Sequence, residues 1–366
     1  MARCQERVLR GLVHQAAATR FGREHDFRRI RSPRDFRRLV RLRTLADFCH
    51  EYWQPTCLVP PSNTWPGKAE PFASAGISTD GTALRVPITP DSLTAHSGAV
   101  GTALSFIACA RPRANLFLGQ LLYLGRQGES VQGTALDTLA MSVLERAPRA
   151  IRPYMVSHSG STVLKAVYDR LPVTCVIGEA KYLSRLFRGL LQATGRNGIS
   201  ELFPRLAAVL YNGTARDKER AELRDLVGNE QVLLLQSWHR PEAPLAVEDP
   251  DQGHLRLLAD NGVYFECVPL QELSSSEPVR HGLDEVVPGV QYEVAISSPA
   301  GVWACLTGER VQFERRQPPL LRRVETSDYS VRPVRPRAPR PTPLPAPEPV
   351  ERASRRPVRL GLLRVR

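Results

Sequence analysis

Three segments of the chain carry residue types that could do chemistry. The first, residues 72–89, is rich in Ser, Thr and Gly and ends in an apolar stretch with one proline. Backbone N–H groups and hydroxyls in such a loop can wrap phosphate oxygens, and a plain surface loop is the alternative interpretation. The second segment begins at Trp238 and holds the carboxylate of Glu242, and the third contains a Gly-Glu pair that ends at Glu309.

In this order and spacing, the three segments resemble the plant auxin-responsive acyl-acid amido synthetases and their bacterial relatives. Residues 21–25 (Phe-Gly-Arg-Glu-His) and 203–206 (Phe-Pro-Arg-Leu) fit the same family, and the resemblance covers about residues 10–325. Its most specific part is the stretch 262–269 together with the tyrosine after Gly289. The resemblance implies an adenylate-forming enzyme, in which ATP activates a carboxylic acid as its acyl-AMP and an amino acid then displaces AMP.

The resemblance also implies a role for each candidate site residue. Glu242 would hold the Mg²⁺ that accompanies ATP. Trp238 would stack on the adenine, Glu309 would hold the ribose hydroxyls, and the first segment would bind the phosphates. The expected nucleotide-binding residues are Ser78, Thr79, Gly81, Trp238 and Glu309.

Four family positions carry other residues here. A Lys expected after the phosphate loop is replaced by Leu84 or Arg85, and the Ser of the second segment is Pro241. The Asp expected at the ribose is Glu309, and the Arg-Tyr pair before it is residues 304–305, Ala-Cys. Because a working ATP site does not usually combine four such changes, we expect adenylation and amide formation to be impaired. Altered nucleotide or acyl binding and full amide synthesis are the other two interpretations.

The net charge of +13 lies at the two ends of the chain. Residues 1–40 hold 11 arginines and four acidic residues, and residues 331–366 hold ten arginines and two acidic residues. Residues 41–330 are therefore close to neutral, which argues against a specific nucleic-acid-binding surface on the main domain. The alternative function is a non-catalytic binding or scaffold protein whose Arg/Pro-rich tail engages an acidic protein partner.

Cysteine usage and hydropathy bear on the compartment. The seven cysteines are scattered and contain no Cys-x-x-Cys pair, which excludes that zinc and redox motif and fits a reducing compartment. The most apolar stretch, residues 100–110, is shorter than the ~20 residues that span a bilayer. We therefore expect a cytoplasmic protein without a membrane span.

The hydrophobic spacing predicts the elements that must position these segments. Between residues 160 and 240, strands alternate with helices, which favours a mainly parallel sheet covered by helices. The predicted helices are 5–20, one capped by Ser32, one from Thr89 to about 110, 135–145, 161–170, 180–194 and 218–226. The predicted strands of this part are 115–124, 173–178, 206–211 and 231–235.

The pattern changes after residue 250 to short strands without helices. These strands are 254–258, 263–268, 291–297, 301–306 and 310–313. The fold class is therefore α/β, with a helix-covered, mainly parallel sheet and an appended small antiparallel sheet or barrel, as in the large domain of adenylate-forming enzymes. We expect this domain to cover residues 1–325, with its β-rich part at about 250–315, and a disordered Arg/Pro-rich tail to cover residues 326–366.

Overall fold

The computed structural model describes most of the chain up to residue 324. The described residues are 1–53, 63–67, 72–77, 81, 83–125, 153–156, 163–164, 167, 169–213 and 217–324. By its contacts the chain divides into two units, residues 1–332 and 333–366, and all described residues belong to the first. The helix predicted over 135–145 and the tail predicted over 326–366 lie outside the described residues.

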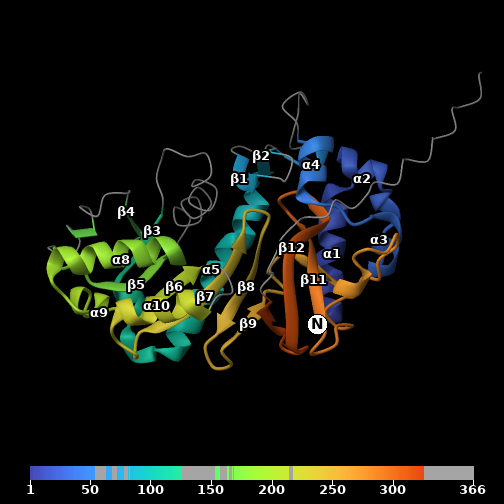
Figure 1. Ribbon diagram of the computed structural model, residues 1–366. Helices are drawn as coiled ribbons and strands as arrows, with labels where there is room; N and C mark the ends of the chain where they lie inside the picture. Colours follow the sequence, from blue (N-terminus) through green and yellow to red (C-terminus); the bar gives the residue numbers. More distant parts are fainter. Residues whose placement is uncertain are drawn as a thin grey trace, which may run out of the picture. The chain divides into compact units, whose positions relative to one another are not determined.

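One sheet of 11 strands runs through the first unit (Figure 1). Its spatial order is β10-β11-β12-β13-β9-β8-β7-β6-β5-β3-β4. The strands from β7 to β4 pair in parallel, and those from β10 to β7 pair in antiparallel. Their bounds are β3 (Gln120–Leu124), β4 (Pro153–Val156), β5 (Val173–Glu179), β6 (Ala208–Asn212), β7 (Leu233–Arg240), β8 (Ala243–Asp249), β9 (His254–Leu257), β10 (Tyr264–Pro269), β11 (Gln291–Ser298), β12 (Val302–Arg315) and β13 (Leu320–Arg323).

This architecture confirms the predicted α/β fold class. The parallel strands β5, β6 and β7 are joined through α8 (Ala180–Thr194), α9 (Ile199–Leu202) and α10 (Asp217–Val227), and the late strands are antiparallel. These late strands continue the parallel strands in one sheet, because β7 pairs with β6 on one side and with β8 on the other. A second, two-stranded sheet consists of β1 (Phe72–Ile77) and β2 (Ala83–Pro87).

Helices cover both faces of the parallel strands. Helices α8, α9 and α10 share a core with Val209 and Leu234, whereas α5 (Pro90–Ala110) shares a core with Leu210 and Leu235. Because neighbouring residues of a strand point to opposite faces, the two cores lie on opposite sides of the sheet. Figure 1 shows α8 and α10 beside β5, β6 and β7.

A third core lies on the antiparallel strands. It joins β10, β11 and β12 to the N-terminal helices α1 (Ala2–Ala16), α2 (Arg20–Glu24), α3 (Pro33–Leu39) and α4 (Leu45–Glu51), and to the one-turn helix η1 (Phe27–Arg29). Large aromatic rings fill it: Trp303 stacks on Phe21 at 6.0 Å and meets Phe27 edge-on at 4.7 Å between ring centroids. The N-terminal helices are therefore part of the folded unit.

Local sequence signals set several helix ends as predicted. The hydroxyl of Ser32 accepts from the Asp35 N–H at the start of α3, and Thr89 and Ser92 form a capping box at the start of α5. Gly195 ends α8 in the left-handed conformation, at φ 64°.

Other element predictions are wrong in their bounds. The helix predicted over 5–20 is α1, which ends at Ala16, and a separate helix, α2, begins at Arg20. The strand predicted from 115 begins at 120, after a one-turn helix η4 (Leu116–Leu118). The two strands predicted over 301–306 and 310–313 are one strand, β12. Strands β8 and β13 were not expected from the sequence.

Helix α5 has the length and hydropathy of a membrane-spanning helix. It is 21 residues long, and the mean hydropathy of its most apolar window is 1.3. It is thus longer than the apolar run 100–110, whose length predicted no membrane span. In the structure, Ala99, Ala103 and Ile107 on one side of α5 are buried against the sheet. The helix therefore serves as a core helix of the described unit.

Candidate functional site

The hairpin between β7 and β8 places Glu242 in its turn. Arg240 pairs with Ala243 across the hairpin, so Pro241 and Glu242 form a two-residue connection. The fixed φ of proline suits the first central position of a tight turn. Glu242 is nevertheless only 2% exposed, and the hydroxyl of Ser298 donates to its carbonyl oxygen at 2.6 Å.

A bulge in β12 places Glu309. The register between β11 and β12 shifts after Glu293, because residues 307–309 form the bulge. Gly308 takes a left-handed conformation there, at φ 74°, and its N–H donates to the carboxylate of Glu293 at 3.1 Å. The N–H of Glu309 donates to the hydroxyl of Thr307 at 3.2 Å, which fixes the end of the bulge.

Two arginines join these carboxylates into one network. Arg240 bridges them, with Nη2 at 3.1 Å from Glu242 Oε1 and Nη1 at 3.1 Å from Glu309 Oε1. Arg323 donates from Nη2 to the other oxygen of Glu309 at 2.8 Å. Burial lowers the pKa of Arg240, but the carboxylates of Glu242 and Glu309 more than offset this, so its pKa lies above its usual value. Arg240 is therefore a permanent cation between two carboxylates.

Arg323 also covers Trp238. Its guanidinium carbon lies 5.2 Å from the centroid of the indole ring, and Nη1 donates to the carbonyl of Gly213 at 2.6 Å. Trp238 itself is 1% exposed. A cation over the ring face is favourable, and the guanidinium of Arg323 covers that face of Trp238.

The described residues of the first segment reach this network only indirectly. Ser78 and Thr79 lie outside the described residues, and Gly81 is exposed, with no described atom within 4 Å of the position of an added Cβ. Strand β2 approaches through Arg85, whose carbonyl accepts from the Cys49 thiol at 3.5 Å. Burial raises the pKa of Cys49, and the carboxylate of Glu242 raises it further.

The family's Lys position, which falls on Leu84 or Arg85, supplies no ammonium. Leu84 is half-buried and packs against the core of the antiparallel strands, and Arg85 is exposed on β2. At the third segment, Ala304 takes a left-handed conformation, at φ 46°, and Cys305 is buried. Cys305 lies near the network: burial raises the pKa of its thiol well above the usual value, and the carboxylate of Glu242 raises it further.

Two histidines, the buried His96 and the half-buried His239, lie beside the β7–β8 turn. His96, on α5, stacks on His239 with 5.8 Å between ring centroids. Burial lowers the pKa of His96 to about 3 and that of His239 to about 4. Both rings are therefore neutral near pH 7.

The structure thus brings together three of the predicted site residues. Trp238, Glu242 and Glu309 are linked through the two arginines, whereas the sequence analysis assigned no role to either arginine. Arg240 could have been found from the sequence, because it lies in the second segment between Trp238, the predicted adenine-stacking residue, and Glu242, the predicted metal ligand. Arg323 comes from β13, which no sequence pattern predicted.

The residues of the network do not fit Mg²⁺ and a nucleotide in this arrangement. One oxygen of Glu242 and both oxygens of Glu309 accept from guanidinium groups. In the part of the chain that the structure describes, no group of three or more His, Cys, Asp and Glu side chains is arranged to hold a metal ion. The expected roles of Trp238 and Glu309 would each require an arginine to move, whereas Oε2 of Glu242 has no hydrogen-bond partner among the described residues.

Comparisons with known proteins match two parts of the chain to family models. The model described as the GH3 family N-terminal domain matches residues 1–165, and the one described as the GH3 family central domain matches residues 256–324. The search of curated proteins finds no match.

Solved structures share the fold. A GH3.15 acyl acid amido synthetase in complex with 2,4-DB is 12% identical, with a TM-score of 0.68, and the match covers 88% of this chain and 67% of that one. A 2-hydroxyisobutyryl-CoA ligase in the postadenylation state, in complex with R3-HIB-AMP, is 9% identical, with a TM-score of 0.62 over 88% of this chain and 66% of that one. The chain thus spans about two thirds of the length of these proteins, and at such identities the likeness shows the fold.

Proposed function

This chain belongs to the GH3 family, and we propose that it is a member whose nucleotide site is filled by its own ion pairs. In this proposal the chain keeps the fold of an adenylate-forming ligase but does not adenylate a carboxylic acid or couple it to an amino acid. ATP, Mg²⁺, an acid and an amino acid would be the substrates and cofactors of the ancestral reaction.

The observation that carries the proposal is the position of Arg240 between Glu242 and Glu309. A ribose bound at Glu309 would have to displace the hydrogen bonds that Arg240 and Arg323 donate to it. Charge-assisted hydrogen bonds are worth about 1.5–3 kcal/mol each, so losing both would cost about 3–6 kcal/mol. That corresponds to a loss of ATP affinity of roughly 100-fold to 10,000-fold.

Glu309 itself adds to this loss. Its side chain is one methylene longer than the Asp of the family pattern, and the bulge that carries it is fixed by hydrogen bonds to Thr307 and Glu293. Because the backbone of the bulge is fixed, Glu309→Asp moves the carboxylate away from Arg240 and Arg323. The guanidinium of Arg323 still covers the indole of Trp238 in this variant. We expect Glu309→Asp, alone or with Leu84→Lys, to produce no heat of ATP binding.

The test is calorimetric titration with ATP and Mg²⁺, together with ATP–pyrophosphate exchange over a library of carboxylic acids. The informative variant is Arg323→Gln, which uncovers the indole of Trp238 and frees one oxygen of Glu309. The matched control is Arg322→Gln on the same strand, because Arg322 is exposed and pairs with Glu314 at 3.2 Å. We expect no binding heat for the wild type or the control and weak binding for Arg323→Gln.

Two results would contradict the proposal. ATP binding by the wild type at micromolar affinity, or exchange that depends on any added acid, would mean that the site is open. If Arg323→Gln binds no better than Arg322→Gln, the cover that Arg323 places on Trp238 is not what excludes the nucleotide.

A further inference from the structure

The first 41 residues form a basic surface on the folded unit. Eleven of their arginines are exposed, and they lie on α1, α2, η1 and α3 or on the short connections between these helices. No lysine occurs before Lys68. The positive charge that the sequence places at this end is therefore fixed in space on helices that pack against the core.

Helix α1 presents part of this charge as a stripe. Arg3, Arg7 and Arg10 follow helical spacing and are exposed, so they lie on one face, and His14 and Ala17 continue that face. The opposite face of α1 is buried in the core of the antiparallel strands. At the middle of the stripe, Nε of Arg10 donates to the carbonyl of Arg31 at 3.0 Å, which joins the stripe to the segment before α3.

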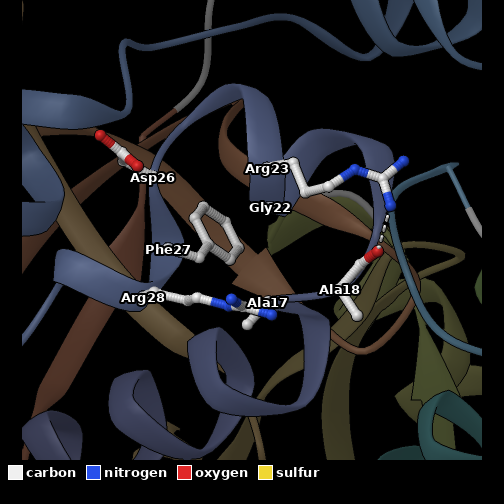
Figure 2. Close-up of a pocket in the computed structure, with 7 residues that line it drawn as sticks. All are labelled: Ala17, Ala18, Gly22, Arg23, Asp26, Phe27 and Arg28. Carbon is white, nitrogen blue, oxygen red and sulfur yellow. Dashed lines mark hydrogen bonds between the residues drawn. The ribbon is translucent and has the colours of Figure 1, made fainter.

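A pocket of about 310 Å³ lies at the end of this stripe, between the last turn of α1, α2 and η1. In Figure 2, the side chains of Arg23 and Arg28 lie on opposite sides of it, and the ring of Phe27 lies between them. Nη1 of Arg23 donates to the carbonyl of Ala18 at 3.0 Å, which holds that guanidinium at the rim. The pocket wall is rigid at Gly22, because an added Cβ there would lie 2.2 Å from the carbonyl oxygen of Ala16.

The acidic residues of the same segment do not neutralise this surface. Each of them pairs with an arginine nearby, and the pairs are Glu6–Arg10, Glu24–Arg20, Asp26–Arg29 and Asp35–Arg38. Within residues 1–41, seven exposed arginines have no carboxylate of the described residues at ion-pair distance, and together they define the basic face: Arg3, Arg7, Arg23, Arg28, Arg31, Arg34 and Arg41.

We propose that the basic face binds the phosphate backbone of nucleic acid without regard to base sequence, with Arg23 and Arg28 at the rim of the pocket, which Asp26 also lines, among the contacts. Arginine is the cation whose planar fork matches phosphate oxygens in pairs, and the face contains no other cation. Insertion into a membrane surface needs exposed large apolar side chains, and those that the structure describes, Phe117, Leu118, Val279 and Val287, all lie outside the first 53 residues. The proposal is independent of the nucleotide site.

The test uses the full-length chain and a fluorescein-labelled, single-stranded RNA of about 20 nucleotides, with fluorescence anisotropy measured as a function of salt. The face variant changes Arg3, Arg7, Arg23 and Arg28 to Gln. The matched control loses the same net charge elsewhere, by changing four exposed arginines of the parallel half of the molecule to Gln: Arg113, Arg185, Arg196 and Arg205.

We expect the wild type and the control to bind with the same salt dependence. The slope of log K against log salt should be shallower by about 3 for the face variant, because each phosphate contact on a single strand contributes about 0.7. Over a salt range of about 50 to 200 mM, the affinity of the wild type should therefore fall about 50-fold more than that of the face variant.

Three results would overturn the proposal. Equal binding by the face variant and the control would place the contacts elsewhere, including on residues 333–366. Equally tight binding of poly-glutamate by the wild type would show a site for acidic chains in general, and preferential binding of anionic lipid vesicles would show a membrane site. Circular dichroism of both variants checks that the helices remain folded.

Discussion

Arg240 is the residue whose replacement tests the ion-pair network most directly. It lies 3.1 Å from Glu242 Oε1 and 3.1 Å from Glu309 Oε1. Glu242 is 2% exposed, and its Oε2 has no hydrogen-bond partner among the described residues. Arg240→Gln would therefore leave a buried carboxylate without a cation, whereas Glu309 would keep Arg323.

The geometry sets the size of the effect. At an effective dielectric constant of about 20, two unit charges 3.1 Å apart attract by about 5 kcal/mol, most of which desolvation offsets. Removing one partner of a buried pair costs about 3–5 kcal/mol. Because 24% of the Arg240 side chain is exposed, we expect the low end of that range, about 3 kcal/mol of unfolding free energy. Arg240→Gln with Glu242→Gln removes both charges and should cost about 1 kcal/mol.

The measurement is urea unfolding followed by tryptophan fluorescence. Arg322→Gln is the control, because its pair with Glu314 has side chains that are 60% and 39% exposed, and such pairs contribute less than about 1 kcal/mol. If Arg240→Gln lowers the unfolding free energy no more than Arg322→Gln does, the network does not hold a buried charge. If the double variant is less stable than Arg240→Gln, the two charges are not coupled as the structure implies.

Three further predictions concern the surroundings of the site. Ala304→Gly should raise the unfolding free energy by about 0.5–1 kcal/mol, because Ala304 sits at φ 46°, and a lower urea midpoint would contradict this. Gly22→Ala should cost at least about 2 kcal/mol, because the new Cβ would lie 2.2 Å from a carbonyl oxygen; a thermal scan measures it. The pKa values of His96 and His239 are about 3 and about 4 in the folded chain, whereas a histidine in the unfolded chain has a pKa near 6.5. Below pH ~6.5 the unfolded chain therefore binds more protons than the folded chain. Stability should therefore fall as the pH drops below about 6.5, by about 2–3 kcal/mol at pH ~5.5, and His96→Asn should reduce that loss by about half.

The sequence alone determined the features whose causes are local. Ser32 and Thr89 predict their helix starts because a cap needs only the three residues that follow it. Gly195 predicts the end of α8 because glycine takes the left-handed conformation at little cost. The alternation of strands and helices predicts a parallel sheet because parallel neighbours need a crossover connection. The segments that resemble the GH3 family also led to Trp238, Glu242 and Glu309.

Only the tertiary structure decided what surrounds those three residues. Arg323 reaches Trp238 and Glu309 because β13 pairs with β12 beside the bulge at 307–309, and no local pattern marks a four-residue strand or the register of its partner. The charge of an arginine can be read from the sequence, but its partners depend on which strands lie side by side. For that reason the sequence singled out Trp238, Glu242 and Glu309, and the fold showed that two arginines of this chain contact them.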